Sequence, residues 1–482
     1  MRHQRLHPWI HEDRLSASRC AFRMRSTFKT PLLLCLLTFG WKCRAGDDLR
    51  AGFAKVDITP PVGAIITGPM GPKSTGTDDP LWARAMVVQS GNKKLALVGI
   101  DLVKIRLDLS DKAIELVTQQ TDITRDGILI CPSHNHSSPL IPMDGDKAIA
   151  NKAYIDTLPK LISDAIVQAN NALQPARMSV GCSLVLEGHI NRRLITKTDG
   201  LVLNTWLKKV NDLKEVPQLL GTESVIDPEL WLVRFDSLEG RMLGSLVNFT
   251  CHPCLHDRIE THNWSADFPG VIADTLAKEF GEQAIGVFTQ GASGNIQPPV
   301  CWAPDWKERA GVFAKAAVEA AKSAVPVEGP VPVDYRRRDV EVPRCNAEAQ
   351  NPLKITRLGW RPESFEGAKR TAELMPKMRK VPVSAARIGP FAIATNAGEL
   401  FVEWGIEVKK RSPFRHTILT ELTNEAAGYE PTRLAFEHEG YETLACVNFI
   451  AVDGIQKLVD TAIELLEELA KKDGETKQSG TR

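Results

Sequence analysis

Short apolar runs alternate with longer stretches of helical periodicity along most of this chain. A short run bounded by turn residues is typical of a buried strand, whereas apolar residues three and four apart indicate a helix. The runs predict strands at residues 85–88, 95–100, 127–131, 232–235, 244–249, 285–289 and 391–395. The helical spacing predicts helices at residues 107–121, 153–172, 268–280 and 455–472. Because the two kinds of segment alternate, we expect an α/β fold, with a layered mixed β-sheet domain flanked by helices.

Two local features add to this pattern. Asp267 directly precedes the helix predicted at residues 268–280, where a carboxylate can accept a hydrogen bond from the first turn, so it is a candidate N-cap. Residues 325–360 are rich in proline and charge. We expect a surface connection or an edge region there, and no domain boundary.

The N-terminal segment has a different character from the rest of the chain. An apolar run at residues 31–41 is shorter than the roughly 20 residues that cross a bilayer, and a basic segment precedes it. A small residue, Ala45, follows, and this order is typical of a secretory signal peptide. We therefore predict an extension and signal peptide at residues 1–45, one domain at residues 46–472 and a polar tail at residues 473–482. The mature protein would be exported, to the periplasm or the extracellular space.

The overall charge gives no reason to expect a nucleic-acid partner. The formal net charge is +1, with 25% charged and 43% hydrophobic residues. A near-neutral chain without a long basic tract in its body has no electrostatic footprint for nucleic acid. We expect none to bind. A transient contact with a membrane surface and the oligomeric state are left open.

The cysteines do not form the pattern of a disulfide framework. Seven follow the predicted signal peptide: Cys131, Cys182, Cys251, Cys254, Cys301, Cys345 and Cys446. An odd number spread over a long chain favours buried free thiols, although one disulfide remains open in an exported protein. Cys251 and Cys254 bracket His252 without a second cysteine pair, which disfavours a structural zinc ribbon.

Histidines follow two of the predicted strands. His134 and His136 come after the strand at residues 127–131, and His252 follows the strand at residues 244–249. In an extended chain, residues two apart point to the same face, so His134 and His136 could share a metal, or one could bind it while the other serves a substrate. Hydrogen-bonded structural histidines remain the alternative at both places. A thiolate-rich metal site at Cys251 or Cys254 is a lesser one.

Four segments, in this order, resemble the neutral ceramidase family. They are Ser-His-Asn-His-Ser-Ser-Pro at residues 133–139, Phe-Thr-Cys-His-Pro at 249–253, Asn-Ala-Gly-Glu-Leu at 396–400, and Leu-Thr-Asn with a later Gly-Tyr-Glu-Pro-Thr at 422–432. Residues 55–63 and the Asn-Arg of residues 191–192 are also similar to that family. Carried over by position, the resemblance implies a catalytic Zn²⁺ bound by His134, His252, Glu399 and Tyr429, on loops at strand ends.

The resemblance also implies an activity. It predicts a zinc-dependent hydrolase that cleaves the amide bond of an N-acyl, ceramide-like small molecule with a metal-activated water. Two imidazoles, a carboxylate and a phenol leave zinc able to hold that water, lower its pKa and polarise a carbonyl. His136 would hydrogen-bond the substrate or carry a proton. Arg192 would hold the carbonyl oxygen or a head group.

One residue departs from the family pattern. Gln297 stands where the resemblance places a catalytic serine. Glutamine cannot act as a nucleophile, but its amide can donate a hydrogen bond to a developing oxyanion, so Gln297 is a third candidate catalytic residue beside His136 and Arg192. Two alternatives therefore remain: a hydrolase of the same fold acting on a different amide or ester, and a secreted binding protein without turnover.

Overall fold

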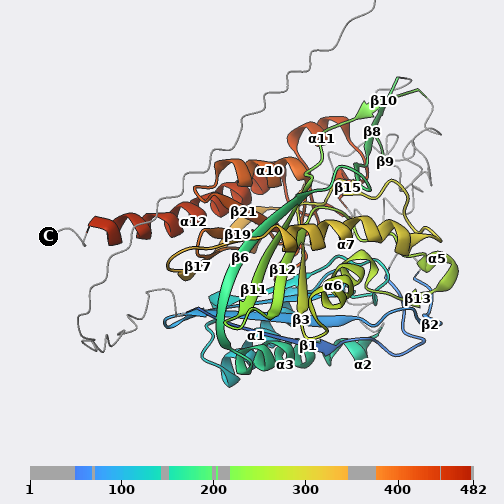
Figure 1. The fold of residues 1–482 in the computed structure, drawn as a ribbon. Coiled ribbons are helices and arrows are strands. Elements are labelled where there is room, and N and C mark those ends of the chain that lie inside the picture. The colour runs from blue at the N-terminus through green and yellow to red at the C-terminus, as the bar shows by residue number, and fades with distance from the viewer. Residues whose placement is uncertain are drawn as a thin grey trace, which may run out of the picture. The chain divides into compact units, whose positions relative to one another are not determined.

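The computed structural model describes residues 49–67, 71–142, 151–197, 202–204, 218–345, 376–445 and 447–478. The predicted extension and signal peptide at residues 1–45, Cys446 and the last four residues of the predicted tail lie outside these ranges. Figure 1 shows the arrangement of the helices and strands. Of the helices in these ranges, none combines the length and apolar character needed to cross a membrane.

A nine-stranded mixed sheet forms the centre of the fold, in the order β14-β12-β11-β6-β1-β3-β4-β5, with β16 pairing β6. Its strands are β1 (Arg50–Asp57), β3 (Trp82–Ser90), β4 (Lys93–Ile100), β5 (Ile128–Pro132), β6 (Gln174–Leu184), β11 (Glu229–Ser237), β12 (Met242–Phe249), β14 (Ile285–Gln290) and β16 (Val325–Pro326). The pairs β4–β5 and β12–β14 are parallel, and the other pairs are antiparallel. The predicted mixed sheet is confirmed.

A second sheet packs against one face of the first. It has the order β17-β18-β19-β21 and consists of β17 (Val333–Pro343), β18 (Met378–Ile388), β19 (Phe391–Thr395) and β21 (His416–Thr420). Buried side chains from both sheets form one cluster, including Leu97, Leu129, Val233, Phe391 and Ile418. The proline-rich stretch expected at an edge contains β17, the edge strand of this second sheet.

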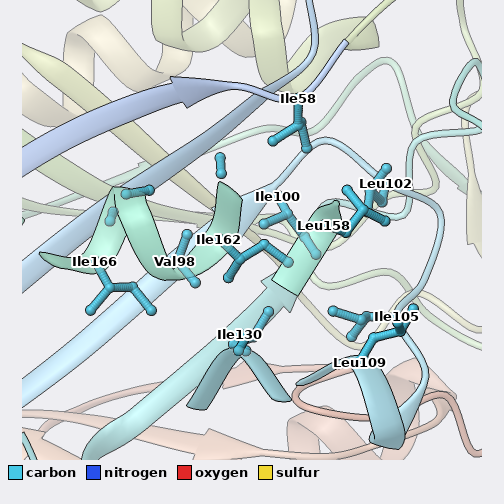
Figure 2. Packing of buried hydrophobic residues seen from close by; sticks show 14 of the residues in the cluster. Ile58, Val98, Ile100, Leu102, Ile105, Leu109, Ile130, Leu158, Ile162 and Ile166 are labelled. Atoms are coloured by element: carbon cyan, nitrogen blue, oxygen red, sulfur yellow. The ribbon is translucent and has the colours of Figure 1, made fainter. Parts of the chain in front are cut away.

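Helices cover the outer faces of both sheets. The longer ones are α1 (Leu107–Gln120), α3 (Leu158–Asn171), α6 (Asp267–Phe280), α7 (Trp306–Lys322), α10 (Val402–Arg411) and α12 (Val452–Gln478). Figure 2 shows Leu158, Ile162 and Ile166 of α3 packed on Val98 and Ile100 of the main sheet. Side chains of α6 and α7 pack on β11, β12 and β14, and α12 packs on the second sheet. The helix predicted at residues 153–172 is two helices, because α2 (Lys152–Ile155) ends before α3 begins with a proline in its first turn.

Short strand pairs connect the loops of the fold. They belong to the sheets β10-β8-β9, β13-β2, β15-β7 and β20-β22. Their bounds are β2 (Gly76–Thr77), β7 (Ile190–Asn191), β8 (Arg193–Thr196), β9 (Val202–Asn204), β10 (Leu219–Thr222), β13 (Asn263–Trp264), β15 (Ile296–Gln297), β20 (Glu399–Leu400) and β22 (Tyr429–Glu430). The short helices α5 (Arg258–Thr261) and α11 (Arg433–His438) lie in the same connecting regions.

The carboxyl ends of strands from both sheets meet at one place. The main-chain N–H of Glu421, just after β21, donates to the carbonyl of Gln290 at the end of β14 (3.0 Å), and that of Asn424 donates to Ile130 in β5 (2.8 Å). Gly99 in β4 makes the approach of β14 feasible, since a Cβ there would lie 2.5 Å from the carbonyl oxygen of Phe288. The loops after β5, β12, β14, β19 and β21 therefore share one region.

Asp267 does not cap helix α6 as predicted. The helix begins at Asp267 itself, and Ala266 occupies the N-cap position. The Asp267 backbone is left-handed (φ 54°), and its buried carboxylate accepts hydrogen bonds from the N–H groups of His256 (2.8 Å) and Phe268 (2.6 Å). The carboxylate therefore joins the loop that follows His252 to the start of α6.

This buried carboxylate predicts a pH-dependent stability. Burial raises the pKa of Asp267 to about 7, and repulsion from Asp79 adds to the effect. An unfolded aspartate titrates near pH 3.9, so the folded protein holds one extra proton between about pH 4 and 7. The stability that the protonated Asp267 contributes to the folded state is fully present below about pH 4 and is lost as the pH rises through 7. Between pH 5 and 8, we expect the unfolding free energy of the wild type to fall by about 3 kcal/mol more than that of Asp267→Asn.

Urea unfolding of both proteins at pH 5 and pH 8 measures this difference. Because the same variant is compared with itself at two pH values, any loss of a hydrogen bond in Asp267→Asn cancels. Equal pH dependence in the variant and the wild type would contradict the assignment.

Candidate metal centre

His134 reaches the site through an unusual backbone conformation. The chain leaves β5 with main-chain hydrogen bonds from Ser133 to Ile100 and from His134 to Leu102, and His134 itself is left-handed (φ 65°). Its Nδ1 lies 2.7 Å from the carbonyl oxygen of Val103, so this nitrogen donates and Nε2 carries the lone pair. The expected extended His-x-His is wrong in this detail, because left-handed backbone breaks the alternation of a strand. The rings of His134 and His136 still lie 5.0 Å apart, edge to face.

His252 is oriented in the same manner on a different loop. Its main-chain N–H donates to Ile296, and its Nδ1 lies 2.8 Å and 3.0 Å from the carbonyl oxygens of Ser293 and Ile296. Burial lowers the pKa of His252 to about 4, and the nearby Arg192 acts in the same direction. The imidazole is therefore neutral at pH 7, with the Nε2 lone pair turned toward the other histidines.

Glu399 completes a group of three facing acceptors. Its Oε2 lies 3.2 Å from His134 Nε2 and 3.4 Å from His252 Nε2. Within the described ranges, His134 Nε2 and Glu399 Oε2 are buried atoms without a hydrogen bond. His252 is neutral and uses its Nδ1 proton on main-chain carbonyls, so it has no proton for the carboxylate, and a neutral His134 would have none either. Lone pairs that converge at such distances repel unless a cation lies between them, so these residues fit a metal ion.

His136 lies in the same group. One ring nitrogen from each of His134, His136 and His252 lies within 4.8 Å of the other two, and His136 is half-buried. In the part of the chain that the structure describes, this trio is the group of histidine, cysteine and acidic donors close enough to hold one metal, and it includes no cysteine. The geometry thus admits His136 as a metal ligand as well as the substrate-facing residue expected from the sequence.

Tyr429 lies beside Glu399, because β20 and β22 pair with Glu399 opposite Tyr429. The tyrosine is buried, and the guanidinium carbon of Arg192 lies 5.4 Å from the centre of its ring. Burial and Glu399 raise the pKa of Tyr429 well above its usual value, while Arg192 opposes them. Its hydroxyl therefore carries its proton at neutral pH, and binding as a phenolate would require the charge of a metal.

Arg192 belongs to a buried network that the sequence did not reveal. Its Nε donates to Glu442 (2.9 Å), its Nη2 donates to the carbonyl of Gly294 (2.8 Å), and its Nη1 lies 3.4 Å from His252 Nε2. The other oxygen of Glu442 accepts from Arg193 (2.8 Å). An ordinary surface salt bridge is therefore the wrong description of Arg192, because both partners are buried. Glu442 stands in no motif, and only the folded chain shows its role.

Glu421 connects the loops that carry the metal donors. Its carboxylate accepts from the Ser293 hydroxyl (2.6 Å), from the Ser293 N–H (3.0 Å) and from the Leu400 N–H (3.0 Å). Glu421 thereby connects Ser293, whose carbonyl orients His252, to Leu400, the residue next to Glu399. Burial raises the pKa of Glu421 well above its usual value. Sequence reasoning missed this residue as well.

A small cavity of about 30 Å³ opens beside these donors. It is lined by His136, Arg192, His252, Cys254, Tyr429 and Tyr441. Gln297 has a different place: it is buried on β15, where it pairs with Ile190 of β7, the strand that leads to Arg192. The structure thus brings together His134, His136, Arg192, His252, Glu399 and Tyr429. Gln297 follows Ile296 on β15, and the Ile296 carbonyl lies 3.0 Å from His252 Nδ1.

The relatives that comparison with known proteins gives here are ceramidases. No family model matches the chain. A neutral ceramidase from Pseudomonas aeruginosa is 25% identical over 295 residues, which cover 57% of this chain and 41% of the relative. The chain therefore spans less than half the length of the curated relative that it matches.

Solved structures of ceramidases also resemble this chain in fold. The crystal structure of neutral ceramidase from Pseudomonas aeruginosa has a TM-score of 0.66 at 20% identity, covering 88% of this chain and 75% of that chain. A ceramidase complexed with C2 has a TM-score of 0.66 at 19% identity, covering 88% and 76%. The comparisons confirm the resemblance to the neutral ceramidases and the α/β fold.

Gly294 allows the first test of the centre. A Cβ at this position would lie 2.3 Å from the carbonyl oxygen of Glu399, against main chain that cannot give way cheaply. We expect Gly294→Ala to displace Glu399 and to weaken Zn²⁺ binding by about 10- to 100-fold, as when groups that support a ligand are removed. Isothermal titration with Zn²⁺ measures the change.

Gly311→Ala is the matched control, because a Cβ at Gly311 in α7 meets open space. It should bind Zn²⁺ as the wild type does. Equal affinities for the two variants, with both folded by circular dichroism, would show that β20 does not hold the metal donors in place.

Proposed function

We propose that this protein is a zinc-dependent amidohydrolase that cleaves the amide bond of an N-acyl, ceramide-like substrate. The observation that carries the proposal is the convergence of His134 Nε2, His252 Nε2 and Glu399 Oε2, with the Nδ1 atom of each imidazole held by a main-chain carbonyl. Similarity to proteins named as neutral ceramidases supports the choice of a lipid amide. The proposal also places the mature protein outside the cytoplasm, which rests on the signal-peptide pattern of residues 1–45.

The donor set favours zinc over harder cations. Imidazole nitrogen and a carboxylate oxygen suit Zn²⁺, whereas Mg²⁺ and Ca²⁺ prefer oxygen ligands alone. His134, His252, Glu399 and Tyr429 would hold the ion, with His136 as the alternative to Tyr429. Zinc bound there would lower the pKa of a coordinated water and polarise the amide carbonyl.

Arg192 and His136 would serve the substrate. Both line the cavity, and Arg192 is fixed there by Glu442 and the Gly294 carbonyl. The guanidinium can therefore bind the carbonyl oxygen or a head group without first being reoriented. His136 can accept a proton from the attacking water and return it to the leaving amine. The cavity of about 30 Å³ has room for little more than a water or two, so a substrate's acyl chain would extend beyond it.

Gln297 favours a second candidate function. It replaces a residue that the resemblance makes catalytic, and it lies buried on β15. A hydrolase of the same fold acting on a different amide or an ester would need no hydroxyl at that position, since a water can attack instead. A binding protein without turnover is the third candidate.

Removing a histidine from the centre tests the proposal. We expect His134→Ala and His252→Ala to lose bound zinc and to lower hydrolysis of a fluorescent N-acyl sphingosine by about 1,000-fold or more, because several kcal/mol of charge stabilisation depend on the metal. His416→Ala is the control, since His416 lies at the opposite end of β21 from the site. Metal analysis and activity with and without a chelator give the readouts.

The outcomes separate the three candidates. Zinc with no ceramide cleavage, but with cleavage of another amide or ester in a panel, would favour the second candidate. Stoichiometric zinc without turnover of any panel member would favour the binding protein. If the purified wild type contains no zinc and His134→Ala changes nothing, both hydrolase candidates fail.

Arg192 provides a second prediction. Lysine keeps the charge but cannot contact Glu442, Gly294 and the substrate at once, because it lacks the planar fork of donors. We expect Arg192→Lys to lower kcat by about 100-fold, as for other losses of an oriented donor, with zinc content unchanged. Arg241→Lys, at an exposed position, is the control. An unchanged kcat would assign Arg192 to folding alone.

A further inference from the structure

Two cysteines touch each other at the edge of the cavity. The Sγ atoms of Cys254 and Cys301 lie 2.8 Å apart, although 47 residues separate them in the chain. Two unbonded sulfur atoms rarely approach so closely, and a disulfide bond measures about 2.05 Å. Cys254 is buried and lines the cavity together with Arg192 and His252, whereas Cys301 is only half-buried.

The main chain holds the two cysteines in position. The N–H of Trp302 donates to the carbonyl of Cys254, and the N–H of Ala303 donates to that of Leu255, both at 2.8 Å. His256 and Ala303 then form a parallel bridge. The segments that carry the two thiols therefore lie side by side already, and a bond between the sulfur atoms needs little backbone movement.

We propose that Cys254 and Cys301 form a disulfide bond in this protein, which ties the loop of His252 to the segment at residues 293–303. The thiolate of Cys301, the more accessible of the two, attacks a small-molecule disulfide such as oxidised glutathione and releases one thiol. Cys254 then attacks the sulfur of Cys301 in the mixed disulfide and releases the second thiol. The two protein thiols lose two protons and two electrons, and the small disulfide takes them up as it becomes two thiols.

A third cysteine nearby does not share this geometry. Cys251 is buried, and its Sγ lies 3.8 Å from the carbonyl oxygen of its neighbour His252. It points to the main chain, whereas Cys254 and Cys301 point to each other. The pair is therefore Cys254 with Cys301, and Cys251 stays a thiol.

The bond would act on the candidate metal centre. The carbonyls of Ser293 and Ile296 orient the imidazole of His252 through Nδ1, and the same segment continues to Cys301. With the bond in place, the His252 loop is fixed both through the ring and through Cys254. We infer that the disulfide holds His252 Nε2 toward Glu399 and slows loss of the metal.

Peptide mapping tests the bond directly. Trypsin releases residues 242–258, which contain Cys251 and Cys254, and residues 279–307, which contain Cys301. After incubation of the full chain with oxidised glutathione, alkylation and digestion without reductant, mass spectrometry should find these two peptides linked, and the link should persist in Cys251→Ser. Loss of the link in Cys251→Ser, or complete alkylation of Cys254 and Cys301 in the wild type, would overturn the proposal.

Two further readouts test what the bond does. Reduction should lower the melting temperature of the wild type by roughly 4 °C, since a bond that closes a loop of this length mainly restricts the unfolded chain. It should also speed the loss of Zn²⁺ to a chelator about tenfold. Cys301→Ser should behave like the reduced wild type and should no longer respond to reductant. Cys182→Ser, a change on β6 outside both segments that carry the pair, should keep the full response.

These outcomes do not depend on the proposed activity. If the linked peptide forms but Zn²⁺ is lost at the same rate with and without reductant, the role in holding His252 is wrong. A protein that forms the link and binds no Zn²⁺ would remove the amidohydrolase proposal and leave the bond in place.

Discussion

The candidate site depends on the convergence of three buried polar atoms, His134 Nε2, His252 Nε2 and Glu399 Oε2. His134 and His252 each use their Nδ1 proton on main-chain carbonyls, so both present Nε2 lone pairs to the same oxygen of Glu399. With both imidazoles neutral, this buried arrangement is repulsive in the absence of a cation. A metal ion turns the same three contacts into attractive ones, and the fold orients the three donors before the ion binds.

That orientation comes from main chain more than from side chains. His134 and His252 are oriented by the carbonyls of Val103 and Ser293, in the loops after β4 and β14 of the main sheet, and by that of Ile296 in β15. Glu399 lies in β20, which follows β19 of the second sheet in the chain. Glu421 joins the two sources, because its carboxylate binds the N–H groups of Ser293 and Leu400. The packing of one sheet on the other thus determines the distances within the centre.

The sequence predicted the helices and strands better than the contacts between residues that are distant in the chain. Continuous apolar runs located β4, β12 and β14 within a few residues, whereas β1 and β6 alternate with polar residues and were missed. His134 and His252 could be found because each follows such a run. Glu399 and Tyr429 meet only through the two-residue pair β20–β22, which has no pattern of its own, so resemblance to a family was needed to propose them. Glu442, Glu421 and the left-handed turn at His134 are products of tertiary packing, and neither spacing nor composition indicates them.

The charges around the centre indicate how a substrate oxygen would be stabilised. Arg192 and Arg193 are balanced within the network by Glu442 and Glu223, two buried cations against two buried anions. Burying such a network costs desolvation energy, which is commonly offset by the position it gives to its members. Arg192 therefore contributes an oriented donor more than net charge. If Tyr429 binds as a neutral phenol, or His136 takes its place, a divalent ion held by neutral imidazoles and the one carboxylate of Glu399 would leave one positive charge uncompensated at the wall of the cavity. In the proposed reaction, that excess charge would outweigh Arg192 in stabilising the carbonyl oxygen as negative charge develops on it.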